Sequence, residues 1–479
     1  MKAILERDKT FYKKIFVIAL PIIIQNFITS SLNIVDTIMI GKLGEVEIAS
    51  VGIGNQYFFL FNILIMGMFS GMAVYTSQYW GRKRYSKYKK VVGLGSLLAV
   101  IIGLIFTVVA LISPSFIVSI FNKSTDVIRL GSEYLGVVCL SYVFTALTFN
   151  FATALRCIEK TSIPMLVSAV ALLTNTFLNW VFIFGNLGAP AMGVKGAAIA
   201  TLIARVLETT ILIAYIYISK SVLAGKMKEL FSFSRDFVKM IFITMIPVLL
   251  NEGCWGLGSV MYNVIYGRIG TQAIASVQIA TTVYNLFMVV IFGIGSASLV
   301  IVGNEIGRGD KDKGYKYGKK CVMLGCIVGI ILSLGLILLS NQIVTLYDVS
   351  EQVRIWARNI LYVIAFIMVI RVYNIIIIVG VLRGGGDAKV SLAIEASTMW
   401  LIGVPVAFIG AFILKLPVYQ VYALCTLEEI VKGVFCLRRF KSKKWINNLV
   451  ELIMINFNRI IAHFFFSNIF YKYKEQLRR

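Results

Sequence analysis

The chain has 479 residues, of which 58% are hydrophobic and only 15% are charged, and its mean hydropathy is +0.85. A soluble chain carries about 25% charged residues, so this composition excludes an ordinary soluble globular protein. The net charge of +24 would suit a nucleic-acid or a membrane surface. Because the basic residues are spread over many short polar segments and do not line one groove, they favour the membrane and argue against nucleic acid as a partner.

Long apolar segments follow one another along the chain, separated by short polar breaks. Each has about 20 residues or more, enough to cross roughly 30 Å of hydrocarbon as a helix. Apolar runs without alternating polarity favour helices over a barrel. The sequence therefore predicts an all-α integral membrane protein with twelve transmembrane helices. The predicted spans are 15–40, 48–78, 91–121, 131–155, 163–184, 196–219, 238–265, 272–304, 321–347, 359–382, 390–414 and 417–437.

Lys and Arg residues lie predominantly on one side of these spans. If the N-terminus is cytoplasmic, 36 of the 47 basic residues fall on cytoplasmic segments and eight on outside loops. This asymmetry predicts a multi-pass protein of the plasma (inner) membrane with N- and C-termini cytoplasmic. Residues 1–14 are charged and do not resemble a signal peptide, so we expect the first span to be retained.

The two halves of the chain repeat each other. A shift of 226 residues places Pro21 on Pro247, and a shift of 227 places Arg156 on Arg383. Such a collinear set indicates duplication. Each half has an even number of spans, so we expect two six-helix lobes related by a pseudo-two-fold axis along the membrane normal. The predicted domains are an N-terminal lobe (1–219), a cytoplasmic linker (220–239), a C-terminal lobe (240–448) and a basic cytoplasmic tail (449–479) with an interfacial helix. Other residues that the 226-residue shift matches are Gly41 with Gly267, Gly44 with Gly270, Ala49-Ser50-Val51 with Ala275-Ser276-Val277, Gly67 with Gly293, and Gly81-Arg82 with Gly307-Arg308.

Several kinds of chemistry are excluded by what the chain lacks. No GxxxxGK[ST] phosphate loop occurs, so a pump would use an ion gradient. His463 is the only histidine, which argues against His-dependent catalysis and most zinc sites. The seven cysteines include no CxxC pair and are interpreted as packing residues. We therefore expect no enzyme activity, no cofactor and no structural metal.

Polar residues within the spans are costly and need a reason. Asp36 lies near the outer end of span one, and Asn175 and Asn179 share a face of span five at a similar depth. We predict that these three side chains meet in a polar pocket in the outward half of the first lobe. Glu252 lies in span seven, so the second lobe carries an acidic group at a different depth. The alternatives are a water-facing helix end for Asp36, interhelical hydrogen bonding for the two asparagines, and a structural ion pair for Glu252.

Other polar residues in the spans carry weaker expectations. Arg205 with Glu208, and Glu428 with Lys432, have the spacing of structural ion pairs on one helix face. Arg371 and Glu395 are left without an assigned role. The repeat-related prolines Pro21 and Pro247 predict helix kinks, which either couple ion binding to helix bending or are static.

Several blocks of this sequence match a known family in order, over about residues 12–448. They are Pro21, Gln25, Ile34-Val35-Asp36-Thr37-Ile38-Met39-Ile40-Gly41-Lys42-Leu43-Gly44 and Ile48-Ala49; Asn175, Asn179-Trp180, Ile183-Phe184-Gly185 and Pro190-Ala191-Met192-Gly193-Val194-Lys195-Gly196-Ala197-Ala198-Ile199-Ala200-Thr201; and Leu382-Arg383-Gly384, Asp387 and Arg438-Arg439-Phe440-Lys441-Ser442-Lys443-Lys444-Trp445. These blocks resemble the multidrug and toxic compound extrusion (MATE) transporters, most closely the NorM-like branch.

The resemblance implies two lobes around a central cavity and export of amphipathic, often cationic, small molecules in exchange for Na⁺ or H⁺. It implies that Asp36, Asn175 and Asn179 form the cation or proton pocket of the first lobe. Glu252 matches the acid in span seven of the NorM-like branch, so Na⁺ is expected at Asp36 or Glu252. The branch also has an acid in span ten, where this chain has Arg371. We expect a monomer whose partners are the lipid bilayer and its substrates. A lipid-linked saccharide flippase of similar architecture is the alternative function.

Overall fold

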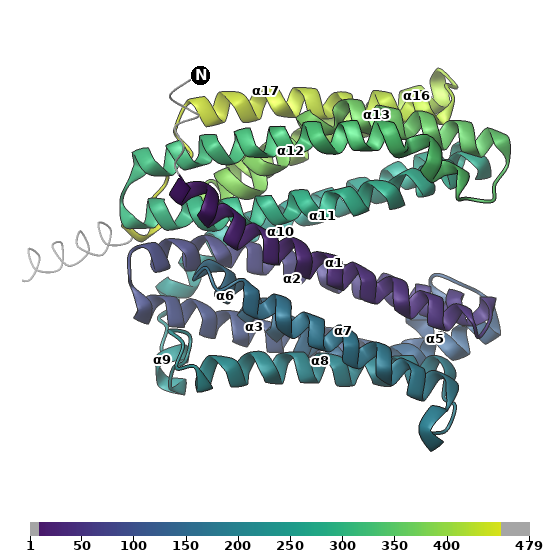
Figure 1. Ribbon diagram of the computed structural model, residues 1–479, viewed down its shortest axis with the longest axis horizontal. Helices are drawn as coiled ribbons and strands as arrows, with labels where there is room; N and C mark the ends of the chain where they lie inside the picture. The colour runs from purple at the N-terminus through teal and green to yellow at the C-terminus, as the bar shows by residue number, and fades with distance from the viewer. Residues whose placement is uncertain (1–8, 452–479) are drawn as a thin grey trace, which may run out of the picture.

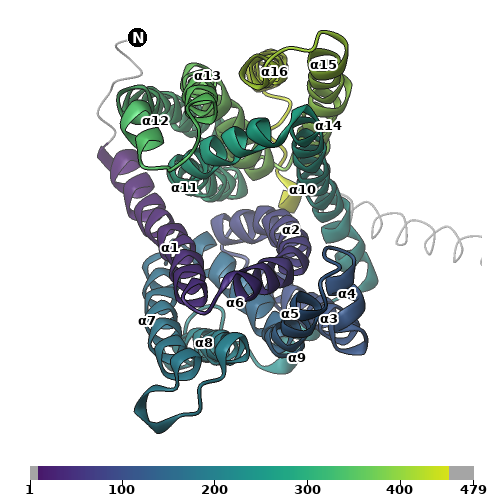
Figure 2. The same cartoon turned by 90° about the vertical axis from the view of Figure 1, so that its right-hand side faces the viewer.

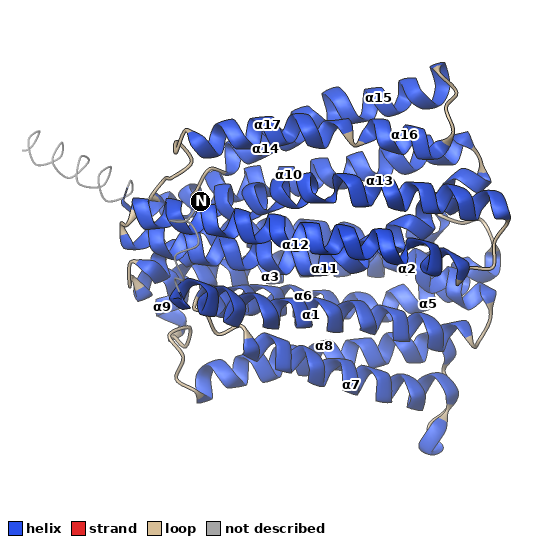
Figure 3. Cartoon of the chain, turned by 45° about the horizontal axis from the view of Figure 1, so that its top comes forward, coloured by secondary structure: helices blue, strands red, loops and turns tan. Residues whose placement is uncertain are grey.

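The computed structural model describes residues 9–451, which form a bundle of helices without any β-strand in this part of the chain (Figure 3). The first half contains α1 (Lys9–Gly41), α2 (Glu45–Gly81), α3 (Tyr85–Ile112), α4 (Pro114–Ser119), α5 (Thr125–Val138), η2 (Cys139–Ser141), α6 (Tyr142–Cys157), α7 (Ser162–Phe184), η3 (Asn186–Gly188) and α8 (Gly193–Ile218).

The second half repeats this order with more irregular helices at its end. It contains α9 (Met227–Phe231), α10 (Arg235–Ile269), α11 (Thr271–Arg308), α12 (Lys311–Thr345), α13 (Glu351–Ile375), η4 (Ile376–Leu382), α14 (Ala388–Thr398), η5 (Met399–Gly403), α15 (Val404–Phe408), η6 (Ile409–Ile413), α16 (Val418–Cys425) and α17 (Leu427–Lys441). The segments η4, η5 and η6 are π-helical.

The predicted spans correspond to these helices. Within residues 9–451, 11 helices are long and apolar enough to cross a membrane. The twelfth crossing is made by α16 and α17, which are separated at Thr426. The predicted span 91–121 runs through a helix break: α3 ends at Ile112, because Pro114 disfavours helical geometry in the residue before it and starts a separate short helix, α4. The fourth span is also interrupted, by a 3₁₀ turn at η2.

The two halves form two lobes, with α1–α8 on one side and α10–α17 on the other (Figures 1 and 2). Equivalent residues make equivalent contacts in each. Ser50 donates a hydrogen bond to the carbonyl oxygen of Val127 at 3.3 Å, and Ser276, 226 residues further on, donates to that of Val353 at 3.2 Å. The predicted duplication is therefore confirmed at the level of individual hydrogen bonds.

Apolar side chains are exposed on the outer helices of both lobes. On α3, Leu104 and Ile105 are exposed, and on the repeat-related α12, Ile331 and Leu338 are exposed. An exposed face of this composition is costly in water but matches lipid chains. The inner helices α2 and α11 are instead mostly buried in their C-terminal halves, so the bundle has a lipid-facing shell around an inner pair of helices.

The inner helices meet where both of them end. A Cβ added at Gly81 would lie 2.0 Å from the carbonyl oxygen of Asn304, and one added at Gly307 would lie 2.1 Å from that of Gln78. Because Gly81 and Gln78 are repeat-equivalent to Gly307 and Asn304, the contact is reciprocal, as a two-fold axis along the helices requires. We call this end of the bundle the basic end, because Arg82 directly follows α2 and Arg308 is the last residue of α11.

Ion pairs and the segment after the last helix join the lobes at the basic end. Lys14 lies 2.7 Å from Glu159 of its own lobe and 3.9 Å from Glu305 of the other. Asn304 donates to Glu159 at 2.9 Å. Gln78 binds the segment that follows α17: it donates to the carbonyl oxygen of Asn447 at 3.1 Å and accepts from the backbone nitrogen of Leu449 at 2.8 Å.

The predicted linker, residues 220–239, contains the short helix α9 and the first residues of α10. It docks on α3, where a Cβ at Gly93 would lie 2.1 Å from the carbonyl oxygen of Leu230. Lys89 donates to Glu229 at 2.8 Å and holds the pKa of that carboxyl below its ordinary value. The predicted interfacial helix of the tail lies outside the described residues. Of the predicted tail, only residues 449–451 are described.

Candidate functional site

Asp36, Asn175 and Asn179 come together between α1 and α7, as the sequence predicts. Asn179 donates from its side-chain nitrogen to Asp36 at 2.5 Å and to the side-chain oxygen of Asn175 at 3.1 Å. Asn175 in turn donates to the hydroxyl of Thr201 on α8 at 3.3 Å. Both asparagines are fully buried, whereas Asp36 is partly exposed. The Asp36 carboxylate is therefore the accessible member of a polar cluster whose amide groups are buried.

The pocket is lined by carboxylate, amide and hydroxyl oxygen atoms. The side-chain oxygen of Asn179 is buried and has no hydrogen-bond donor, and it belongs to the same side chain that contacts Asp36. A carboxylate with amide and hydroxyl oxygens suits a hard cation or a proton. Within the described residues no three His, Cys, Asp or Glu side chains are grouped to hold a metal.

A chain of buried polar contacts extends through the same lobe. Gln25 donates to Ser168 at 3.0 Å, and Ser168 donates to Glu208 at 2.8 Å. Arg205 lies 2.8 Å from Glu208, which confirms the predicted ion pair. The spacing on α7 and α8 places these residues on the helix faces that also carry Asn175 and Thr201. The Asp36 pocket is thus one end of a polar seam between α1, α7 and α8.

Glu252 lies in an ion pair with Arg383 at 2.7 Å. The Arg383 guanidinium also donates to Asn251 at 2.5 Å and to Ser70 of the other lobe at 3.1 Å. Arg383 directly follows η4, where the tenth predicted span ends, yet it is only 2% exposed. Its side chain turns into the bundle because the Glu252 carboxylate compensates its charge and Asn251 accepts a hydrogen bond there. The sequence left Glu252 with two roles, a coupling site or a structural ion pair. The structure shows the ion pair.

The same arrangement recurs in the first lobe without its acid. Arg156 donates to Gln25 at 2.6 Å, as its repeat equivalent Arg383 donates to Asn251. At the position equivalent to Glu252 the first lobe has Asn26. The arginine–amide contact is therefore common to both lobes, and the carboxylate is specific to the second.

Pro21 and Pro247 both lie inside long helices and are buried. Each removes one backbone N–H from its helix. Pro21 lies between the start of α1 and Asp36, so a bend at this proline would move the carboxylate relative to α7. That coupling stays a prediction.

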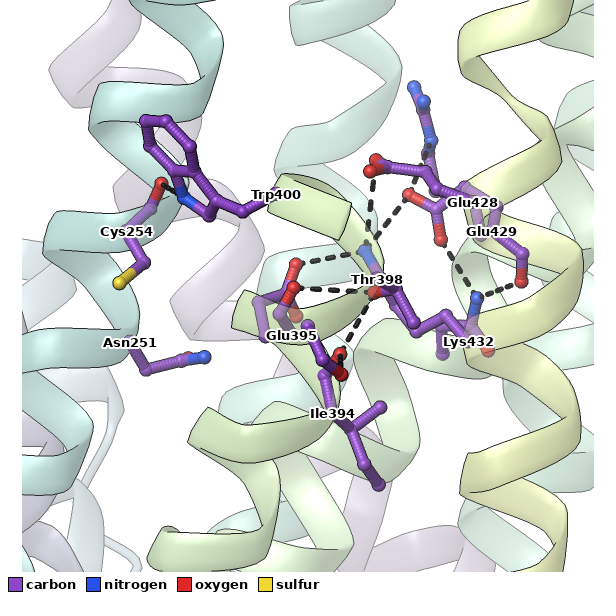
Figure 4. A network of polar contacts seen from close by, with 12 residues as sticks. Asn251, Cys254, Ile394, Glu395, Thr398, Trp400, Glu428, Glu429 and Lys432 are labelled. Carbon is purple, nitrogen blue, oxygen red and sulfur yellow. Dashed lines mark hydrogen bonds and ion pairs between the residues drawn. The ribbon is translucent and has the colours of Figure 1, made fainter. Parts of the chain in front are cut away.

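The second lobe contains a buried ionic cluster that the sequence did not predict as a site (Figure 4). Lys432 on α17 lies 2.9 Å from Glu395 on α14, 3.5 Å from Glu429 and 3.9 Å from Glu428. Arg371 on α13 lies 3.3 Å from Glu429. The predicted pair of Glu428 and Lys432 is thus confirmed as part of a larger group, which also gives Arg371 and Glu395 their partners. Intramembrane charges at these positions were visible in the sequence, but their partners lie on different helices.

The sequence profile of the MatE family matches residues 21–181 and 247–409, one block in each lobe. The chain belongs to the MATE family of transporters. It is 25% identical over 443 residues to the uncharacterized transporter YisQ of Bacillus subtilis (strain 168), covering 92% of this chain and 96% of that protein. It is 23% identical to the probable multidrug resistance protein NorM of Thermotoga maritima, covering 90% and 93% of the two chains.

Solved MATE structures have the same fold. An outward-facing multidrug resistance MATE transporter matches with a TM-score of 0.83 at 19% identity, covering 90% of this chain and 96% of the other. A MATE crystal structure in a bent conformation matches with a TM-score of 0.82 at 18% identity, covering 91% and 96%. These likenesses support the twelve-helix, two-lobe architecture and do not favour the flippase alternative.

Proposed function

We propose that this MATE-family chain is a cation-coupled antiporter that exports amphipathic, often cationic, small molecules by alternating access. The relatives named as multidrug resistance proteins support export of such compounds. We further propose that it lies in the plasma (inner) membrane with both termini cytoplasmic, which the excess of basic residues at the basic end supports.

The observation that carries this proposal is the Asp36 pocket. A carboxylate inside a transmembrane helix is retained against a high cost when it serves transport. Here Asp36 has Asn179 as its hydrogen-bond partner and no cation within ion-pair distance in the described part of the chain. Its charge is therefore open to Na⁺ or H⁺, and the unpaired oxygen of Asn179 is a further ligand for Na⁺ or a hydrogen-bond acceptor beside a protonated Asp36.

The described conformation corresponds in this proposal to the state closed toward the cytoplasm. The polar contacts between the lobes lie from Ser70 toward the basic end, where Lys14, Gln78 and Asn304 join the two halves. In the opposite state these contacts would separate, while the lobes would close at the other end. Binding of an ion at Asp36 on the outer side would then favour release of cargo and return to the cytoplasmic-facing state.

The ion gradient supplies enough free energy for useful export. One positive charge entering down about 100 mV supplies roughly 2.3 kcal/mol. At about 1.4 kcal/mol per tenfold change, one ion sustains a cargo gradient of roughly fifty-fold. A cationic cargo that moves against the same potential lowers this figure.

The test is efflux of ethidium, a cationic dye, from vesicles that contain the full chain. Efflux is driven in separate arms by an imposed Na⁺ gradient and an imposed pH gradient. Asp36→Asn keeps the shape of the side chain but removes its charge, and we expect it to abolish efflux in whichever arm drives the wild type. Asp126→Asn, an exposed position at the start of α5, is the matched control and should transport as the wild type does. Full efflux by Asp36→Asn in both arms would refute the proposal.

A further inference from the structure

The ionic cluster of the second lobe does not balance its own charge. It contains three carboxylates, those of Glu395, Glu428 and Glu429, and two cations, Arg371 and Lys432. No other charged side chain of the described residues lies within ion-pair distance of these five, as the ion pairs of this lobe show. With every group ionised, the cluster would carry one uncompensated negative charge.

An uncompensated charge is costly at this place. Glu428, Glu429 and Lys432 are each less than a tenth exposed, and they lie inside helices of the membrane-spanning bundle. A buried charge without a partner pays its desolvation penalty in full, so proteins pair it or neutralise it. One more positive charge is therefore required, and the cluster must obtain it from outside its own side chains.

Glu428 is the carboxylate with the weakest compensation. Glu395 lies 2.9 Å from Lys432. Glu429 has Lys432 at 3.5 Å, Arg371 at 3.3 Å and a hydrogen bond from Asn374 at 2.8 Å. Glu428 has only Lys432 at 3.9 Å and a hydrogen bond from the hydroxyl of Tyr262 at 3.0 Å. The missing positive charge is therefore needed at Glu428.

A second, separate observation indicates the same deficit of donors. The side-chain oxygen of Asn374, a residue that is 1% exposed, has no hydrogen-bond donor. It faces Gly433, next to Lys432, while its nitrogen binds Glu429. The cluster thus contains an unpaired acceptor as well as an excess carboxylate. One added proton removes the excess charge of the cluster.

The surroundings allow a proton but offer little to a larger cation. A Cβ at Gly403 would lie 2.3 Å from the Glu428 carboxylate and 2.0 Å from the Tyr262 hydroxyl, so the π-helical segment η5 packs directly on both. The π-helical form is often found at functional sites. The titratable and charged groups around Glu428 are Tyr262 on α10, Arg371 on α13, Glu395 on α14, Tyr422 and Cys425 on α16, and Glu429 and Lys432 on its own helix.

We infer that Glu428 carries an exchangeable proton, so that the second lobe has its own proton site in α17, separate from the Glu252–Arg383 pair. The cluster is neutral when Glu428 is protonated and carries one negative charge when the proton leaves. Arg371 and Glu395, whose side chains are 16% and 13% exposed, connect the cluster with the surface of the chain. Exchange of this proton during export rests on the proposed antiport function, whereas the protonation itself does not.

The protonation is tested with the purified full chain by infrared difference spectroscopy between about pH 6 and pH 9, a range in which buried glutamic acids are known to titrate. We expect the carbonyl band of a protonated carboxyl group at the lower pH. Glu428→Gln should remove that band and release about one proton fewer per chain in a parallel titration, by the charge count above. Glu428→Asp should move the band, while Glu429→Asp should leave it in place.

Two controls separate this site from others. Glu351→Gln, whose side chain is 72% exposed, should change neither the band nor the proton count. Asp36→Asn should leave the Glu428 band unchanged. A band that Glu428→Gln and Glu428→Asp both leave untouched would overturn the assignment of the proton.

Exchange is tested by ethidium efflux under an imposed pH gradient. If the Glu428 proton is exchanged, the efflux rate of Glu428→Gln no longer changes with that gradient. Unaltered pH dependence in this variant would overturn the exchange step even if the band is assigned to Glu428. Loss of function at Asp36 is measured independently, so failure of the proposed antiport and failure of this site give different results.

Discussion

Gly81 and Asn304 lie so close that a Cβ on the glycine would be 2.0 Å from the asparagine carbonyl oxygen. The mirror contact of Gly307 with Gln78 has nearly the same geometry, with 2.1 Å between the equivalent atoms. Two inner helices from opposite lobes therefore touch backbone to backbone at the basic end. Only glycine permits this approach, because any side chain would separate the lobes.

Gly81→Ala should weaken this closure. The backbone of Asn304 has to move to make room, and overpacking of this kind costs about 1–3 kcal/mol. We expect a lower unfolding midpoint of the purified protein and slower ethidium efflux. Gly52→Ala is the matched control on the same helix, since nothing lies within 4 Å of a Cβ at that position. Identical melting of Gly81→Ala and wild type would show that the lobes do not pack as described.

Glu252→Gln should destabilise the protein by leaving Arg383 buried without its carboxylate. Breaking one side of a buried ion pair costs about 3–5 kcal/mol. Arg383→Met should have a comparable effect, and the double variant should be less destabilised than the sum of the two. The measurement is a double-mutant cycle of unfolding midpoints. Additive effects would argue against the ion pair.

Asn179→Asp should change the ion that the first-lobe pocket prefers. The new carboxylate would lie at the place from which Asn179 now donates to Asp36 at 2.5 Å. Two carboxylates at such a distance cannot both be ionised, so the pair would retain one proton. We expect efflux driven by a pH gradient to increase relative to efflux driven by Na⁺. An unchanged ratio of the two rates would contradict this account of the pocket.

Gln78→Ala should loosen the segment after α17. The variant loses hydrogen bonds to the backbone of Gly384, Asn447 and Leu449, each worth about 0.5–1.5 kcal/mol. We expect faster proteolytic cleavage at the residues following Trp445 and a modest loss of efflux. Gln420→Ala, at an exposed position, is the control. Equal cleavage rates in the two variants would speak against a bridging role for Gln78.

Glu229→Gln tests the docking of α9. Lys89 lowers the pKa of this carboxyl from its ordinary value of 4.5, so the contact stabilises the fold above that value and is lost as the pH falls below it. The unfolding midpoint of the wild type should exceed that of the variant slightly at neutral pH. The difference should vanish near about pH 3, below the ordinary carboxyl range. If the unfolding midpoints of wild type and variant still differ at that pH, the Lys89–Glu229 contact is not the cause of the difference.

The sequence alone predicted the apolar helices, the duplication and the grouping of Asp36 with Asn175 and Asn179. Helical periodicity places residues four apart on one face, and the depth of a residue in a span follows from its distance to the span end. The helix face and the depth of a residue both follow from local sequence, so they can be predicted without knowing how the helices pack. The break before Pro114 was missed because the apolar run continues through it.

The tertiary structure decided which charges meet. Arg383 follows the end of a predicted span, yet it is buried against Glu252 and Ser70. Arg371 forms an ion pair with Glu429, which lies about sixty residues further along the chain on another helix. Ion pairs form between helices whose neighbours and rotation are set by packing, and neither is encoded in hydropathy. The charge deficit at Glu428 arises only when α10, α13, α14 and α17 are assembled around it.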